Sequence, residues 1–244
     1  MKTMIMCAGL GTRLKPWTDE HPKALVPVGG VPMLRRVIER LADQGFDEVT
    51  INVHHFADQI IEFIQKEKLP VENINVSHES KALLDTGGGI LNAESFLAKD
   101  SRPFLVHNVD ILSNADLKKL YDAFEKSDAH IILLVSGRNS ERRLVFDKCL
   151  NLKGWVNLKT GHIRPDNLII NEEDKILAFS GIYIMSPEVF SIMKNGGFSG
   201  AFPIMDFFLS GISDLKIKGV FQDGLEIIDI GKPDTLHRAN LKIQ

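Results

Sequence analysis

Two glycines and two cations near the N-terminus have the types and spacing needed to bind a phosphate group. Gly9 and Gly11 follow an apolar run, and Arg13 comes next in the segment A-G-L-G-T-R-L-K-P. Glycine-rich turns expose backbone N–H groups to anions. Arg13 offers a planar fork of donors, and Lys23 in P-K-A-L adds a compact charge. The competing interpretation is a plain turn with both cations solvated. The predicted phosphate contacts are Ala8, Gly9, Gly11, Thr12, Arg13 and Lys23.

Two familiar phosphate loops are excluded by one residue of this segment. The dinucleotide fingerprint G-x-G-x-x-G and the P-loop pattern G-x-x-x-x-G-K both require glycine at position 14, which is Leu14. The segment is therefore neither a nicotinamide dehydrogenase loop nor a Walker A loop.

Two aspartates each end an apolar run. Asp110 closes F-L-V-H-N-V-D, and Asp229 lies in E-I-I-D-I-G. Ligands of open α/β sheets bind beyond the carboxyl ends of strands, and carboxylates there can hold Mg²⁺ together with phosphate oxygens. Each aspartate is therefore a candidate metal ligand. For either one alone, a helix cap or a surface position competes with this interpretation.

A second glycine cluster lies in L-D-T-G-G-G-I. Thr86 is predicted to cap a helix over 86–97, and Gly87 and Gly88 remove side chains where a flat nucleobase could approach closely. A flexible turn is the alternative. Glu79 and Asp85 could accept from a base N–H or a sugar hydroxyl, although each could also be an ordinary solvated acid.

Alternating strands and helices must position these residues. The first 136 residues predict repeated strand–helix units, which imply right-handed crossovers and a doubly wound sheet. The fold class is α/β, a Rossmann-like mixed sheet with a small irregular second half rich in strands. We predict one domain over 1–244, with a nucleotide-binding half (1–136) and a sugar-phosphate-binding half (137–244). Predicted strands are 3–8, 48–53, 71–77, 104–109, 130–135, 144–147, 151–158, 176–185, 215–220 and 225–230; predicted helices begin near 32, 57, 86, 113, 187, 202 and 232.

Composition excludes several classes of partner. The 244 residues carry 29 basic and 32 acidic side chains, a net charge of −3, so a nucleic-acid partner has no electrostatic support. Two distant cysteines, Cys7 and Cys149, argue against a disulfide framework or a zinc site. No apolar stretch is long enough to span a membrane. We expect a cytoplasmic protein, a monomer or small homo-oligomer, with no membrane partner.

The compound segment A-G-L-G-T-R-L-K-P followed by P-K-A-L-V-P-V-G-G-V-P-M-L resembles the signature of the sugar-1-phosphate nucleotidyltransferases. The resemblance implies that the loop wraps a nucleoside triphosphate, with Arg13 and Lys23 on its phosphates. The paired aspartates match the family's metal-binding N-x-D and D-I-G contexts, except that Val109 stands where glycine is commoner. Asn108 is expected to help position the nucleotide. The form L-D-T-G-G-G-I is similar to the N-acetylmuramate 1-phosphate uridylyltransferases, which implies a role in peptidoglycan recycling.

The sequence identifies fewer residues that could bind the acceptor, the sugar 1-phosphate. F-S-G-I resembles the strand that lines the family's acceptor pocket, which implies that Ser180 and Gly181 lie beside the sugar, with Asp85 and Asn157 as further sugar contacts. A core strand with a glycine bulge is the alternative. The Glu-Lys-Pro stretch of many relatives is absent. Possible basic substitutes are Lys153, Lys159 and Arg164, and Lys232 could reach a phosphate or lie on the surface.

The resemblance implies an in-line displacement in which a sugar 1-phosphate attacks the α-phosphorus of an NTP and pyrophosphate leaves. Positioning and charge neutralisation would carry the catalysis. Arg13, Lys23 and Asp110 are the expected catalytic residues, with Mg²⁺ as the cofactor. UTP with N-acetylmuramate 1-phosphate is the first expectation. The alternatives are a guanylyl- or thymidylyltransferase acting on a hexose 1-phosphate, a CTP:phosphocholine cytidylyltransferase, and a regulatory module that binds nucleotide sugars without turnover.

Overall fold

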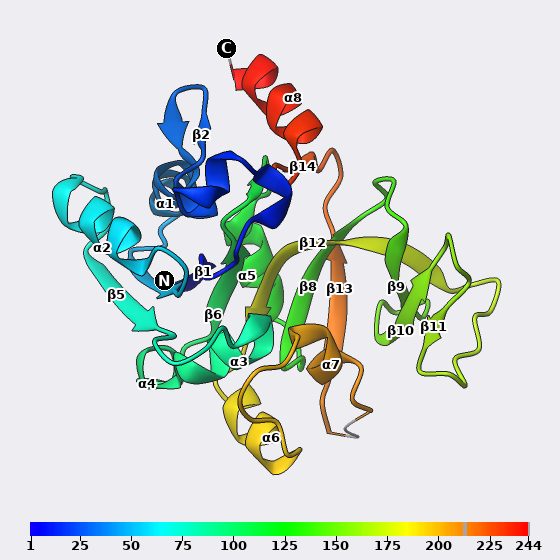
Figure 1. The fold of residues 1–244 in the computed structure, drawn as a ribbon. Coiled ribbons are helices and arrows are strands. Elements are labelled where there is room, and N and C mark those ends of the chain that lie inside the picture. The colour runs from blue at the N-terminus through cyan, green and yellow to red at the C-terminus, as the bar shows by residue number, and fades with distance from the viewer. Residues whose placement is uncertain (212–213, 244) are drawn as a thin grey trace.

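A ten-stranded mixed sheet forms the centre of the computed structural model, which describes residues 1–211 and 214–243 (Figure 1). Its main path runs β11-β10-β9-β12-β6-β1-β4-β5, and β8 pairs with both β12 and β13. These strands are β1 (Lys2–Met6), β4 (Glu48–Val53), β5 (Asn73–His78), β6 (Phe104–Asn108), β8 (Ile131–Ser136), β9 (Arg142–Phe146), β10 (Leu152–Asn157), β11 (Ile163–Arg164), β12 (Lys175–Met185) and β13 (Ile217–Phe221).

Helices and two small sheets surround this centre. The helices are α1 (Met33–Asp43), α2 (Ala57–Lys66), α3 (Asp85–Asn92), α4 (Glu94–Leu97), α5 (Leu117–Glu125), α6 (Val189–Asn195), α7 (Ile204–Phe208) and α8 (Pro233–Ile243). The small sheets pair β2 (Pro27–Val28) with β3 (Val31–Pro32), and β7 (Ile111–Ser113) with β14 (Ile227–Asp229). Three 3₁₀ turns lie in the loop after β1, at Thr12–Leu14, Trp17–Asp19 and Lys23–Leu25.

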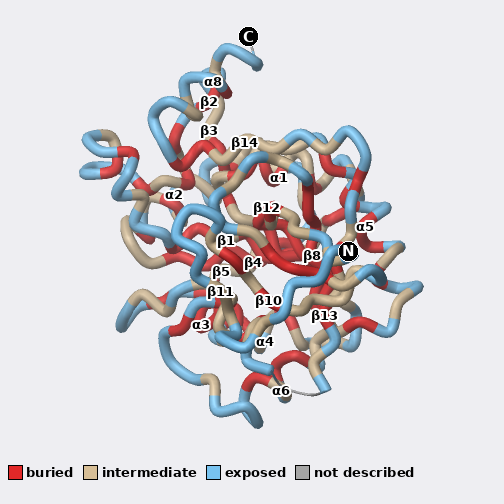
Figure 2. The backbone as a smooth tube through the Cα atoms, turned by 90° about the vertical axis from the view of Figure 1, so that its right-hand side faces the viewer, coloured by how far each residue is buried: buried red, intermediate tan, exposed pale blue. Residues whose placement is uncertain are grey.

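Strand β1 shows how the sheet is covered on both faces. It pairs in parallel with β4 and with β6. Because alternate side chains of a strand point to opposite faces, Ile5 joins a core with α1, α2 and α5. Met4 joins the second core, with α4, α6 and α7. Figure 2 shows buried residues along the central strands and exposed ones at the rim. The predicted doubly wound α/β fold is confirmed.

Antiparallel strands extend the sheet beyond the parallel part. The long strand β12 is antiparallel to β6, β8 and β9, while β13 is parallel to β8. Strands from both predicted halves, 1–136 and 137–244, thus belong to one sheet. The register between β12 and β8 shifts between Phe179 and Tyr183, around the predicted glycine bulge.

The predicted starts of two helices need correction. The helix predicted over 86–97 is two helices, α3 and α4, and Thr86 does not cap α3, because its hydroxyl accepts from the backbone N–H of Ile204 at 2.9 Å. Ser113 belongs to β7, and α5 is capped by Asp116, whose carboxylate accepts from the N–H of Lys119 at 2.8 Å. At the start of each of these two helices, contacts with distant segments determine which residue is free to cap the helix.

None of the helices within the described residues reaches the length and apolarity that a membrane crossing requires.

Candidate active site

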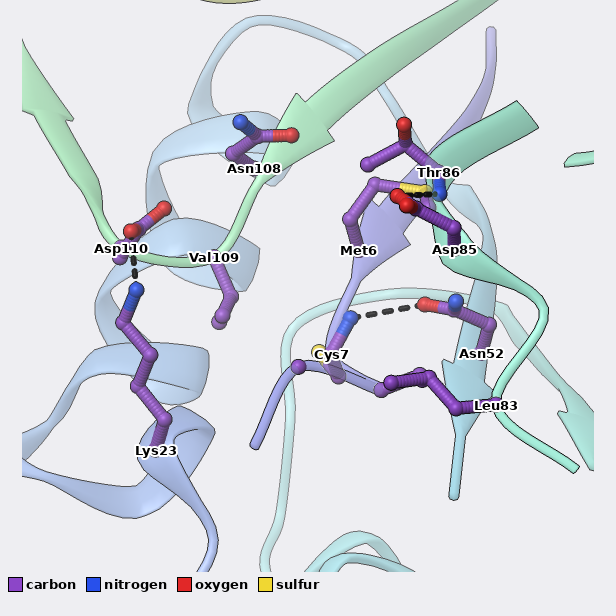
Figure 3. A pocket seen from close by; sticks show the side chains of 12 residues that line it. Met6, Cys7, Lys23, Asn52, Leu83, Asp85, Thr86, Asn108, Val109 and Asp110 are labelled. Atoms are coloured by element: carbon purple, nitrogen blue, oxygen red, sulfur yellow. Dashed lines mark hydrogen bonds and ion pairs between the residues drawn. The ribbon is translucent and has the colours of Figure 1, made fainter. Parts of the chain in front are cut away.

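A cavity of about 300 Å³ opens at the carboxyl ends of β1, β4 and β6. Parallel strands end at one edge of a sheet, so residues distant in sequence meet there. Of the predicted nucleotide and sugar contacts, this cavity brings together Ala8, Gly9, Lys23, Asp85, Thr86, Asn108 and Asp110 (Figure 3).

The glycine loop over this cavity has free backbone donors. Within the described residues, no protein acceptor faces the N–H groups of Gly9, Leu10 and Gly11. Gly11 is in the left-handed region at φ 65°, and a Cβ there would lie 2.9 Å from the Cβ of Lys23. Glycine therefore allows the loop to turn and to pack against the Lys23 segment. The arrangement fits an anion at the loop, as the sequence predicts.

Lys23 and Asp110 form an ion pair at the edge of the cavity (Figure 3). Each side chain is only 14% exposed. Lys23 comes from the third 3₁₀ turn, and Asp110 follows the end of β6. The lysine ammonium thus already neutralises the carboxylate that was predicted to bind a metal.

Strand β14 brings Asp229 to the same place. It pairs antiparallel with β7 so that Asp229 lies opposite Ile111, and the N–H of Ile230 donates to the carbonyl oxygen of Asp110 at 2.9 Å. Oδ1 of Asp229 accepts from the N–H of Gly231 at 2.8 Å. Asp110, in the turn before β7, and Asp229, at the end of β14, are therefore brought to the same place although they lie far apart in the sequence.

Gly231 marks the point where the cations and Asp229 meet. A Cβ on this residue would lie 2.7 Å from Nη2 of Arg13, 2.8 Å from Oδ1 of Asp229 and 3.2 Å from Nζ of Lys23. A side chain at this position would have to shift the end of at least one of these side chains. The structure thus brings the predicted residues Arg13, Lys23, Asp110 and Asp229 together.

The donor set fits a hard divalent cation. Both acids present carboxylate oxygens, the ligands that Mg²⁺ prefers, and the Lys23 ammonium already occupies a cation position beside Asp110. Within the described chain, no cluster of three or more His, Cys, Asp or Glu side chains is suited to a metal. The protein would therefore supply two ligands, and phosphate oxygens and water would complete the coordination of Mg²⁺.

Glu79, a predicted nucleotide contact, does not line the cavity itself but bonds to Asn52, which does. It is 2% exposed, and its carboxylate accepts from Nδ2 of Asn52 at 2.7 Å and from the N–H of Leu84 at 2.9 Å. Oδ1 of Asn52 in turn accepts from the N–H of Cys7 at 2.7 Å. Because both carboxylate oxygens are engaged by the protein, Glu79 positions the strand ends and the glycine loop, and the solvated alternative is wrong.

The predicted reason for Gly87 and Gly88 also needs correction. A Cβ on Gly87 would overlap the ring of Phe202, and one on Gly88 would overlap the carbonyl oxygen of Gly200. Their N–H groups donate to the carbonyl oxygen of Phe202 at 2.9 and 3.2 Å. Both glycines are buried. The 200–202 segment fills the space that their side chains would occupy, so no nucleobase can lie in that space.

The predicted acceptor residues are dispersed. The hydroxyl of Ser180 accepts from the N–H of Ile182 at 3.0 Å, and Gly181, at φ 79°, lies against Asn108. The amide oxygen of Asn157 accepts from the N–H of Lys159 at 2.9 Å in the turn after β10. The bulge interpretation therefore holds for β12, where Ser180 bonds within the strand, and Asn157 bonds within the turn after β10. The possible basic substitutes have carboxylate partners: Lys153 with Asp174, Lys159 with Glu141 and Arg164 with Asp206.

Sequence reasoning missed two polar residues. Asn52 lies in the apolar strand E-V-T-I-N-V, where a lone amide near the strand end is the signal that could have found it. Arg138 follows β8, and it carries no signal beyond its charge in G-R-N-S. Cys7 also lines the cavity, and burial, with a smaller contribution from Asp110, raises the pKa of its thiol well above the usual range. It therefore stays protonated and is no nucleophile.

Comparison with known proteins places this geometry in a family. The sequence profile described as "Nucleotidyl transferase" matches residues 2–145. The chain is 27% identical to the N-acetylmuramate alpha-1-phosphate uridylyltransferase of Caulobacter vibrioides, covering 98% of this chain and 96% of the relative. It is 32% identical to the enzyme of that name from Neisseria meningitidis serogroup B, covering 84% of each chain.

The fold agrees with a solved structure over the whole length. The crystal structure of HddC from Yersinia pseudotuberculosis superimposes with a TM-score of 0.78 at 26% identity, covering 100% of this chain and 99% of that one. Since the profile covers more than half of the chain and the Neisseria relative exceeds 30% identity, the chain belongs to the nucleotidyl transferase family, as a sugar-1-phosphate nucleotidyltransferase.

Proposed function

We propose that the enzyme transfers the uridylyl group of UTP to N-acetylmuramate 1-phosphate, releasing pyrophosphate and forming a UDP-sugar. The two relatives that carry the uridylyltransferase name support this pairing, and so does the L-D-T-G-G-G-I segment. On this proposal the protein acts in the cytoplasm, in peptidoglycan recycling.

The observation that carries the proposal is the meeting of Arg13, Lys23 and Asp229 around Gly231, with Asp110 bound to Lys23. A triphosphate needs several cations and N–H donors at one place, and the free N–H groups of the adjacent loop supply the donors. A catalytic role follows for this group, because charge develops on the leaving pyrophosphate in the transition state.

In the proposed reaction, an oxygen of the sugar 1-phosphate attacks the α-phosphorus of the NTP as the bond to the β-phosphate oxygen breaks. The attacking phosphate is ionised at neutral pH, so no general base is required. Arg13 binds the leaving pyrophosphate, and Lys23 turns from Asp110 to the α-phosphate. Glu79 and Asn52 hold the loop and the strand ends in register. Positioning and charge neutralisation then lower the barrier.

Asp110 and Asp229 would hold Mg²⁺. When bound, the ion supplies charge neutralisation between the two phosphates that react. The nucleoside would lie in the cavity beyond Lys23, where Asn108, Asp85 and Thr86 offer polar contacts and Leu83 an apolar one.

Removal of the metal gives a direct check. We expect EDTA to abolish pyrophosphate release and added Mg²⁺ to restore it, because Lys23 cannot neutralise Asp110 and a phosphate at the same time. Pyrophosphate release is measured before chelation, after it, and after Mg²⁺ is added back. Undiminished release in excess EDTA contradicts the metal proposal and leaves the reaction class intact.

The substrates are tested by a matrix of four NTPs against a panel of sugar 1-phosphates, with phosphocholine included, scored by pyrophosphate release. We expect the highest kcat/KM for UTP with N-acetylmuramate 1-phosphate. A preference for GTP or dTTP with a hexose 1-phosphate, or for CTP with phosphocholine, contradicts the proposed substrates. Nucleotide-sugar binding without release from any pair would identify a regulatory module.

A further inference from the structure

Two segments of the chain carry the paired carboxylates, and they run antiparallel to each other. Their strands, β7 and β14, pair at three positions. Backbone bonds continue the pairing beyond both ends of these strands. At one end the N–H of Ile230 donates to the carbonyl oxygen of Asp110 at 2.9 Å. At the other end the N–H of Asn114 donates to the carbonyl oxygen of Glu226 at 3.3 Å. The two segments thus form one short antiparallel ribbon.

The side chain of Asn114 extends this ribbon beyond its last backbone bond. Its Nδ2 donates to the carbonyl oxygen of Gly224 at 2.9 Å, and its Oδ1 accepts from the N–H of Glu226 at 2.8 Å. A primary amide has both donors and an acceptor, so it can pair with backbone groups as a neighbouring strand would. Gly224 is in the left-handed region at φ 67°, where the chain turns from β13 toward β14. The amide of Asn114 therefore fastens the turn that leads into β14.

Gln222 makes the reciprocal contact from the other segment. Its Oε1 accepts from the backbone N–H of Asp116 at 3.0 Å, and its Nε2 donates to the carbonyl oxygen of the same residue at 2.7 Å. Gln222 is only 7% exposed, so loss of its amide would leave backbone groups of Asp116 without this partner in a place that water reaches poorly. Asp116 also caps α5, a helix of the first core. The two amides thus fasten the turn before β14 to a firmly packed part of the fold.

Strand β14 needs such fastening because it lies apart from the ten-stranded sheet. It has three residues, all only partly buried, and its sheet contains no strand besides β7. A ribbon of two strands is marginally stable in water unless other contacts hold it. Buried Ile230 anchors the end of this ribbon that lies next to Asp229, and the two amides anchor the other end. The place of Asp229 therefore depends on contacts made several residues away from it.

We propose that Asn114 is a positioning residue for the carboxylate pair. Together with Gln222, it holds the segment of Asp229 on the segment of Asp110 and so sets the affinity of the two acids for a divalent cation. The inference rests on the proposed function, since it requires both acids to hold one cation. Neither amide lines the active-site cavity, so their effect passes through the ribbon. A molecule with an open ribbon offers the cation one carboxylate in place of two, and the apparent affinity falls with the fraction of closed molecules.

The test measures how tightly wild-type protein and Asn114→Ala bind Mn²⁺, used as a probe for Mg²⁺. The free Mn²⁺ that remains in solution is determined by electron paramagnetic resonance. Asn114 is exposed, so we expect the variant to fold. Its Kd for Mn²⁺ should rise about fivefold, because the loss of two hydrogen bonds increases the population of open ribbon. Asp110→Asn should abolish the binding, which establishes that Mn²⁺ reports on the carboxylate pair.

Kinetics separate positioning from a general loss of stability. In Asn114→Ala, KM for Mg²⁺ in pyrophosphate release should rise about as much as Kd, while kcat at saturating Mg²⁺ stays within about twofold of wild type, because enough metal selects the closed ribbon. Asn151→Ala is the matched control. It removes an asparagine amide that bonds to Asp147 in the turn before β10, beside the start of β13 rather than its end. Kd for Mn²⁺ and KM for Mg²⁺ should be unchanged in this control.

Gln222→Met approaches the ribbon from its other segment, since it keeps the length of the side chain without the amide, and it should raise Kd for Mn²⁺ as well. An unchanged Kd in folded Asn114→Ala overturns the proposal, and so does an equal rise in the Asn151→Ala control. Wild-type protein that binds no Mn²⁺, or whose binding survives Asp110→Asn, would instead overturn the metal assignment of the proposed function. The two failures are therefore distinguishable.

Discussion

Asp110→Asn should lower kcat/KM for pyrophosphate release on the order of a hundredfold, which corresponds to about 3 kcal/mol of lost transition-state stabilisation. The substitution keeps the shape of the side chain and removes the charge that would hold Mg²⁺ beside Asp229. It also removes the carboxylate partner of Lys23. Initial rates over a range of Mg²⁺ concentrations measure the effect, which should be largest when Mg²⁺ is limiting.

Asp122→Asn is the control for this prediction. Asp122 is exposed on α5, so the variant removes an equal charge far from the cavity and should keep wild-type kinetics. Asp110→Asn must also be shown to fold, by its urea midpoint, because its ion pair with Lys23 is largely buried. A folded Asp110→Asn variant with full activity at limiting Mg²⁺ would show that this carboxylate holds no metal.

The parallel half of the fold was predictable from local pattern. Strand Glu48–Val53 has the predicted bounds, and helix Ala57–Lys66 begins where predicted, because an apolar run fits a covered strand and a helical repeat fits a helix with one buried face. Strand-end acids were predictable for a related reason, since the carboxyl edge of a parallel sheet is where polar groups meet a ligand. That reasoning identified Asp110 and Asp229 as separate candidates, and their pairing came from the resemblance to the nucleotidyltransferases.

Contacts between distant segments were not predictable from local pattern. Strand β7 was missed because three residues are too few to show the alternation of apolar and polar side chains that marks a strand. Its pairing with β14 nevertheless brings Asp229 beside Asp110. The hydrogen bond from Arg138 to the carbonyl oxygen of Phe179 joins positions 41 residues apart, so no local pattern could reveal it. The local motif of Ser180 also could not reveal that its hydroxyl bonds the backbone of Ile182 in its own strand.

Gly88→Ala tests whether the glycines of α3 exist for packing. An alanine Cβ at this position would overlap the carbonyl oxygen of Gly200 and would lie 3.1 Å from the Cβ of Leu84. Alanine favours a helix over glycine by about 1 kcal/mol, which would stabilise α3 if space allowed. Backbone cannot rotate away as a side chain can, so the overlap should dominate and destabilise the fold by about 2–3 kcal/mol.

The thermal midpoint of Gly88→Ala should therefore fall by about 5–10 °C, whereas Gly137→Ala, with nothing within 4 Å of its Cβ, should stay close to wild type. Since α3 begins at Asp85 and its glycines are bonded to Phe202, relief of the overlap would also move Asp85 and Thr86 away from the cavity. KM for the NTP should then rise in protein that remains folded. Equal thermal midpoints for the two alanine variants would mean that the 200–202 segment can move aside at little cost in stability. The space at Gly88 could then be occupied by a ligand.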